Sequence, residues 1–120
     1  MSSAQIDLTS ILNSWTKEIS KGIHKAQDEL GKEGAQKLQV NSPKRSGKRG
    51  GGYAKGWASK KNGTGVVVYN KDNYQLTHLL EFGHALRNGD RTAPQPHIGP
   101  VEEDLVTEYE KRVREVIDNA

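Results

Sequence analysis

The sequence predicts an α+β fold: a long N-terminal helix, a long basic loop, and a small antiparallel β-sheet with a short helix and a C-terminal helix packed on it. Apolar residues recur at steps of three and four near both ends of the chain, which is typical of amphipathic helices. Between these regions an Asn-Gly pair separates two β-prone runs, which is typical of a hairpin. Because a chain of 120 residues is long enough for one domain and too short for two, we expect residues 1–120 to form a single domain.

The first helical pattern begins at Leu8. Gly31 and Gly34 mark a stop or a weak point, because glycine costs about 1 kcal/mol relative to alanine inside a helix. Apolar residues nevertheless continue the pattern to about residue 38. The predicted stripe consists of Leu8, Ile11, Leu12, Trp15, Ile19, Ile23, Ala26 and Leu30.

Residues 41–56 contain six glycines or prolines and no apolar period. Such a segment buries too little apolar surface to offset its ordering entropy, so we expect a flexible loop. Residues 41–61 carry seven basic side chains and no acid, whereas seven acids face three bases from residue 101 onward. The two regions are either complementary faces between copies or simply solvated surfaces. As a hypothesis, the partner interface contains Lys44, Arg45, Lys48, Arg49, Lys55, Trp57, Lys60 and Lys61.

A hairpin is predicted around "NGTG", because Asn-Gly tolerates the positive φ that a tight turn needs. We expect its strands at about 53–60 and 65–70. The run from Val66 to Tyr69 is unbroken by polar residues, which predicts a strand covered on both faces.

A short helix is predicted next, with Asp72 or Asn73 as its cap and Gly83 as the residue after its end. An irregular stretch with three prolines follows. The last helix is expected to hold Pro100 in its first turn, with residues 102–104 as acids beside the positive end of its dipole.

Two histidines and an acid, His78, Glu81 and His84, raise the question of a metal site. Their spacing of three and three differs from the His-Glu-x-x-His pattern that places two histidines on one helical face. We therefore expect no metal site and no cofactor. Glu81 is predicted to make a structural hydrogen bond that pins the following turn, and His97 to orient the approach to the last helix.

No catalytic template is recognisable in the sequence, and the absence of cysteine excludes thiolate chemistry. We expect a protein that is not an enzyme. Nucleic-acid binding is the alternative, since the basic residues of 44–61 alternate with Tyr53 and Trp57, which can stack on bases. The acidic C-terminal region argues against it, because it would repel a phosphate backbone unless it faces away.

Taken together and in order, several short motifs resemble the tail-completion or head–tail joining proteins of long-tailed bacteriophages. Gln95 and Val101 depart from the residues common at their positions, while the remaining pieces match over roughly residues 5–118. The matching residues are Ser42, Pro43, Ser46, Gly47, Gly56, Trp57, Tyr74, Glu81, Phe82, Gly83, Pro96, His97, Ile98 and Pro100.

The resemblance implies a non-enzymatic virion protein at the neck, a tail terminator or a connector layer, assembled in the host cytoplasm. Its implied partners are copies of itself in a ring, commonly a hexamer, together with the tail tube protein and the head connector or stopper. DNA would pass through the lumen of the ring, and no membrane is implied. Tyr74, Glu81, Phe82, Gly83, Pro96, His97 and Pro100 would form its structural motif.

Overall fold

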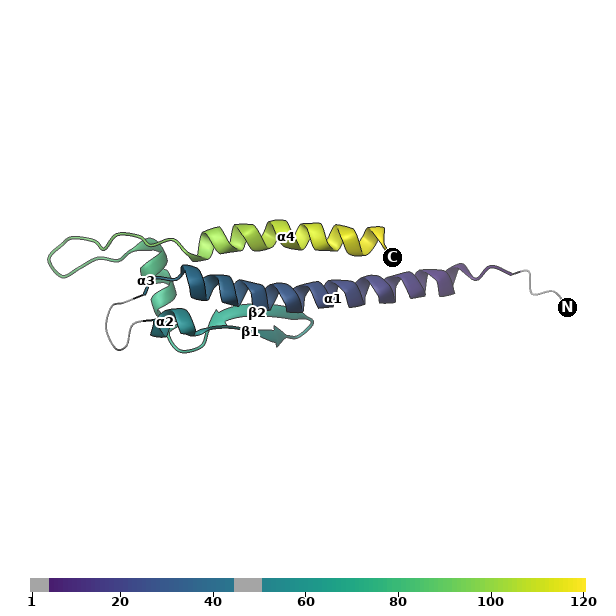
Figure 1. Ribbon diagram of the computed structural model, residues 1–120, viewed down its shortest axis with the longest axis horizontal. Coiled ribbons are helices and arrows are strands. Elements are labelled where there is room, and N and C mark those ends of the chain that lie inside the picture. The colour runs from purple at the N-terminus through teal and green to yellow at the C-terminus, as the bar shows by residue number, and fades with distance from the viewer. Residues whose placement is uncertain (1–4, 45–50) are drawn as a thin grey trace.

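The computed structural model describes residues 5–44 and 51–120 and confirms the α+β fold. The long helix α1 is the central element: α4 runs along one side of it and the hairpin β1–β2 lies on another (Figure 1). The C-terminal helix therefore packs mainly on α1 rather than over the sheet. The elements are α1 (Leu8–Asn41), α2 (Gly52–Lys55), β1 (Trp57–Asn62), β2 (Gly65–Asn70), α3 (Leu76–Phe82) and α4 (Ile98–Asp118).

Helix α1 begins at a side-chain cap and continues past the predicted weak point to Asn41. The Asp7 carboxylate accepts hydrogen bonds from backbone amides in the first turn, which satisfies donors that have no partner in the helix. Gly31 and Gly34 lie inside the helix, at positions where other elements pack closely against its backbone. A Cβ atom at Gly31 would lie 2.6 Å from Val66 Cγ1, and one at Gly34 would lie 2.7 Å from a Leu105 methyl group. These glycines let the hairpin and α4 approach the α1 backbone closely.

The hairpin forms where the sequence predicts it, but its first strand begins at Trp57, four residues later than expected. Gly63 is the first residue of the two-residue turn and has φ +62°. Tight hairpin turns need a positive φ at this position, which glycine adopts without strain. Val66 and Val68 face α1, where they lie near Gly31 and Gly34. The prediction that both faces of β2 are covered is wrong: Val67 points away from α1 and is 37 % exposed. A two-stranded sheet has one helix to pack on, and its other face meets solvent.

The segment predicted as a loop over 41–56 is partly helical. Asn41 ends α1, and a single helical turn, α2, occupies Gly52–Lys55 with Tyr53 buried. Residues 45–50 lie outside the described part of the chain. Tyr53 is ordered by the core, since its ring packs edge-on against Trp57 at 5.7 Å between centroids. Tertiary contact thus overrides the glycine-rich composition of residues 51–56.

Helix α3 begins at Leu76, without a side-chain cap, so neither Asp72 nor Asn73 caps it as predicted. The Asn73 amide instead donates to the side chain of Asn70, which shapes the turn before the helix. Gly83 follows α3 with φ +73°, confirming its predicted place after the helix end. A Cβ atom there would collide with the carbonyl oxygen of Thr92.

The core lies around the C-terminal half of α1, while the N-terminal part of the predicted apolar stripe is uncovered. Every residue from 5 to 18 is exposed. The buried core cluster consists of Ala35, Leu38, Tyr53, Trp57 and Val101. None of the helices in the described residues is long and apolar enough to cross a membrane.

Candidate assembly interface

Glu81 caps helix α4 from a different helix. Its carboxylate accepts hydrogen bonds from the backbone amides of His97 (2.8 Å), Ile98 (2.9 Å) and Gly99 (3.0 Å). These amides open α4 and have no partner within the helix. The predicted structural hydrogen bond of Glu81 therefore exists, but it holds the start of α4 rather than the turn directly after α3.

The acids predicted to stabilise the start of α4 lie too far along the chain. No acidic residue occupies the first turn of α4, and residues 102–104 are exposed in its second turn. Pro100 does lie in the first turn, as predicted. The negative charge beside the helix N-terminus comes from Glu81, because the fold brings α3 there.

His97 links this cap to the aromatic core. It is 1 % exposed, and its Nε2 lies 2.7 Å from the Tyr53 hydroxyl. Its Nδ1 lies 2.8 Å from the Gln95 carbonyl oxygen and 3.0 Å from a Glu81 carboxylate oxygen. Nδ1 donates a hydrogen bond, because both of its neighbours are acceptors, and Nε2 is hydrogen-bonded to the Tyr53 hydroxyl, so both ring nitrogens have partners. The prediction that His97 orients the approach to α4 agrees with this position.

The electrostatics of the cluster follow from burial and from these donors. Burial alone would raise the pKa of Glu81, but the amides of His97, Ile98 and Gly99 outweigh it, and the pKa lies below its ordinary value of 4.5. Burial, and secondarily the charge of Glu81, raises the pKa of Tyr53 to about 12. At neutral pH the cluster contains a carboxylate and a protonated phenol.

Two further polar side chains, which sequence reasoning missed, hold the opposite side of the aromatic core. Ser42 accepts a 2.7 Å hydrogen bond from Trp57 Nε1, and Asn70 donates one of 2.7 Å to the Tyr53 carbonyl oxygen. Both residues are buried. The Ser-Pro pair at the end of α1 was a signal for Ser42, but no local pattern distinguishes Asn70 from an ordinary strand-end asparagine.

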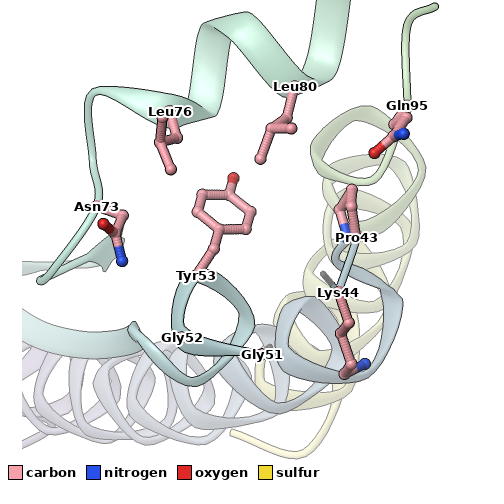
Figure 2. Close-up of a pocket in the computed structure, with 9 residues that line it drawn as sticks. All are labelled: Pro43, Lys44, Gly51, Gly52, Tyr53, Asn73, Leu76, Leu80 and Gln95. Carbon is pink, nitrogen blue, oxygen red and sulfur yellow. The ribbon is translucent and has the colours of Figure 1, made fainter. Parts of the chain in front are cut away.

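A cavity of about 590 Å³ opens beside this cluster. In Figure 2 the Tyr53 ring projects into it, opposite Leu76 and Leu80 of α3. The cavity combines an apolar centre with polar groups at its edges. Its lining consists of Pro43, Lys44, Gly51, Gly52, Tyr53, Asn73, Leu76, Leu80 and Gln95.

The predicted interface residues do not form one surface. Lys44, at the rim of the cavity, and Lys55 of α2 are exposed. Lys60 lies over the Tyr69 ring at 4.6 Å, and Lys61 lies 3.9 Å from Asp28 of α1. These two lysines have partners within the chain.

The aromatic residues of the basic segment are buried. Trp57 is 5 % exposed and belongs to the core, and Tyr53 is 8 % exposed, so neither ring is available to stack on a base. Arg45, Lys48 and Arg49 lie outside the described residues. In the described part of this segment Lys44, Lys55, Lys60 and Lys61 are exposed, and of these Lys60 and Lys61 have partners within the chain.

The side chains of His78, Glu81 and His84, which raised the question of a metal site, do not converge. His78 is exposed and packs against Phe82, while His84 lies 3.1 Å from the Thr92 hydroxyl. Both oxygens of Glu81 accept the amide hydrogen bonds at the start of α4. Within residues 5–44 and 51–120, no three His, Asp or Glu side chains are grouped so that they would hold a metal ion.

The remaining motif residues divide between backbone geometry and surface. Gly83 is buried at its strained turn, whereas Pro96 and Pro100 are exposed at the approach to α4. Tyr74 is 72 % exposed and Phe82 is 63 % exposed. One of these exposed rings lies just before α3 and the other at its last residue, although burying such rings normally stabilises a fold.

A sequence model of one protein family, described as "Bacteriophage HK97-gp10, putative tail-component", matches residues 7–83. The match begins at the cap of α1 and ends at the glycine after α3. No curated protein and no solved structure matches the chain. The chain therefore belongs to the HK97-gp10-like family and is a structural component of the bacteriophage tail in the virion.

Proposed function

We propose that this tail component acts at the head–tail junction, where a ring of copies completes the tail and receives the head connector. The role is architectural and uses no catalytic residue or cofactor. DNA passes through the lumen of the ring, and the tail tube protein and the connector or stopper bind its two sides.

The proposal is supported most by a rigid, hydrogen-bonded frame, formed by Glu81, His97 and Tyr53, that lies beside a cavity with exposed lysines near it. Glu81 fixes the start of α4 through hydrogen bonds of 2.8–3.0 Å, and His97 ties that point to Tyr53. The cavity beside them has Lys44 at its rim, and Lys55 is exposed on α2. Such an arrangement suits docking, because the frame keeps its shape while Lys44 and Lys55 present positive charge to a partner.

Electron microscopy of the parent phage with this gene deleted tests the position in the virion. Filled heads beside separate, unjoined tails are expected. Intact virions would refute a role in joining.

A charge-reversal variant tests the basic segment itself. Replacing Lys44, Arg45, Lys48 and Arg49 by glutamate is expected to block joining while the circular dichroism spectrum stays unchanged. Normal joining would refute docking through this segment, and lost DNA binding with normal joining would favour the nucleic-acid alternative. The matched control reverses four exposed lysines on the helices: Lys25, Lys32, Lys37 and Lys111.

A further inference from the structure

We infer that the N-terminal part of α1 binds a second copy of this chain at the exposed face of α3, in a head-to-tail contact. The two surfaces are named here the α1 stripe and the α3 face. The α1 stripe consists of Ile6, Leu8, Ile11, Leu12 and Trp15. The α3 face consists of the exposed apolar residues on and next to α3: Leu79 and Phe82 within the helix, Tyr74 before it and Leu86 after it.

The α1 stripe lies on the same apolar side of α1 as the buried residues farther along the helix, but the stripe itself is exposed. Farther along the same helix, Ala26 and Leu30 are buried. In the stripe, by contrast, Leu8 is 74 % exposed, Leu12 60 % and Trp15 54 %. The spacing of three and four is unbroken between the two halves, so the helix presents one apolar side throughout. Within residues 5–44 and 51–120, only the C-terminal half of this apolar side is covered.

No described segment of the same molecule is placed to cover the stripe. Gly22 of α1 lies against Val116, and α4 ends two residues later at Asp118. In Figure 1 the start of α1 extends beyond the end of α4, and every residue from 5 to 18 is exposed. Because none of the described residues covers the stripe, its position points to another molecule as the partner.

A matching surface lies at the other end of the same chain. The α3 face carries two aromatic rings and two leucines, with exposed fractions between 40 % and 72 %. Figure 1 shows α3 and the start of α1 toward opposite ends of an elongated molecule, whose longest extent is 87 Å. The two surfaces cannot meet within one molecule, but each can meet the other on a neighbouring copy.

The areas agree with such a contact. The nine side chains together expose apolar surface on the order of 1,000 Å², close to what a specific interface buries in total once a polar rim is added. A contact between two different surfaces repeats from copy to copy and closes into a ring when the rotation permits. The inference thus supplies the contact for the ring in the proposed function, although its test needs only purified protein.

Cross-linking in this cysteine-free chain provides the test. Leu12→Cys and Phe82→Cys are made as separate proteins, mixed, and treated with a short bis-maleimide. A mixed Leu12→Cys/Phe82→Cys dimer is expected as the main product. Lys17→Cys is the matched control, because it is exposed on the opposite side of α1. Dimers of Leu12→Cys alone as the main product, equal reaction of the control, or no dimer at any protein concentration would each overturn the inference.

Sedimentation of charged variants gives a second, independent result. Leu12→Glu and Phe82→Glu are each expected to weaken self-association about thirtyfold, with unchanged helix content. Mixing them is expected to restore a one-to-one dimer, because one intact stripe and one intact α3 face remain in each pair. A mixture that stays monomeric would overturn the head-to-tail arrangement. Since neither experiment involves heads or connectors, failure here is distinguishable from failure of the proposed role at the junction.

Discussion

Replacing Glu81 by alanine is expected to lower the free energy of unfolding by about 3 kcal/mol, because three amides at the start of α4 lose their shared acceptor. Each backbone amide costs about 1 kcal/mol when it is left without an acceptor. The amide of His97 belongs to a residue that is buried, so water cannot readily replace the lost carboxylate. Glu81→Gln keeps one oxygen as acceptor but loses the charge beside the helix N-terminus. We expect it to cost about half as much.

Urea unfolding followed by circular dichroism measures both variants, since urea leaves electrostatic interactions unscreened. Glu102→Gln is the matched control, because this exposed acid lies in the second turn of α4 and should change the stability by less than about 0.5 kcal/mol. If Glu81→Gln is as stable as the wild type while Glu102→Gln is not, the acids of α4 itself provide the charge and the reasoning fails.

The same cap predicts a pH dependence. The folded-state pKa of Glu81 is lowered, so the unfolded chain binds the proton more readily and stability rises with pH across this window. The contribution is complete above the ordinary pKa of 4.5 and is lost as the pH falls through the lowered value. The difference between wild type and Glu81→Gln should therefore shrink in acid. A difference that is constant from pH 7 to pH 3 would contradict the charged cap.

Three other perturbations follow from the packing. Gly31→Ala is expected to destabilise the fold by about 1 kcal/mol, because overpacking against Val66 outweighs the gain in helix propensity; a higher melting temperature would contradict it. Gly83→Ala should cost about 2 kcal/mol or more, since φ is +73° and a backbone oxygen blocks the side chain; unchanged urea unfolding would contradict this strain. Tyr53 has a raised pKa of about 12, so the stability that it contributes is complete below pH 10 and is lost as the pH rises through 12. Ultraviolet titration should show this phenol ionising last, and ionisation near pH 10 would refute its burial beside Glu81.

The fold was predictable where the signal is local. The helical period from Leu8, the turn at Gly63 and the glycine that ends α3 are each specified by neighbouring residues, and the structure has them in place. The prediction failed where a distant contact decides. Residues 52–55 form a helical turn because Tyr53 packs into the core, although their composition indicates a loop.

The candidate site shows the same division. The structural role of Glu81 followed from a single acid beside apolar residues near a helix end, and the resemblance to a phage tail family agrees with the match over residues 7–83. Its hydrogen-bond partners are sixteen to eighteen positions away, so no local pattern names them. The buried positions of Trp57 and Asn70 were hidden for the same reason.

The sequence by itself determined the order of helices and strands, the charge asymmetry and the family, because these depend on side-chain period, turn chemistry and short ordered motifs. Only the tertiary structure decided that Gly31 and Gly34 are packing positions, that α4 is capped by Glu81, and that half of the α1 apolar stripe has no cover. Each of these depends on which distant segment lies opposite a residue. Burial and hydrogen bonding are properties of such pairs of segments, and a periodic pattern along one segment does not specify its partner.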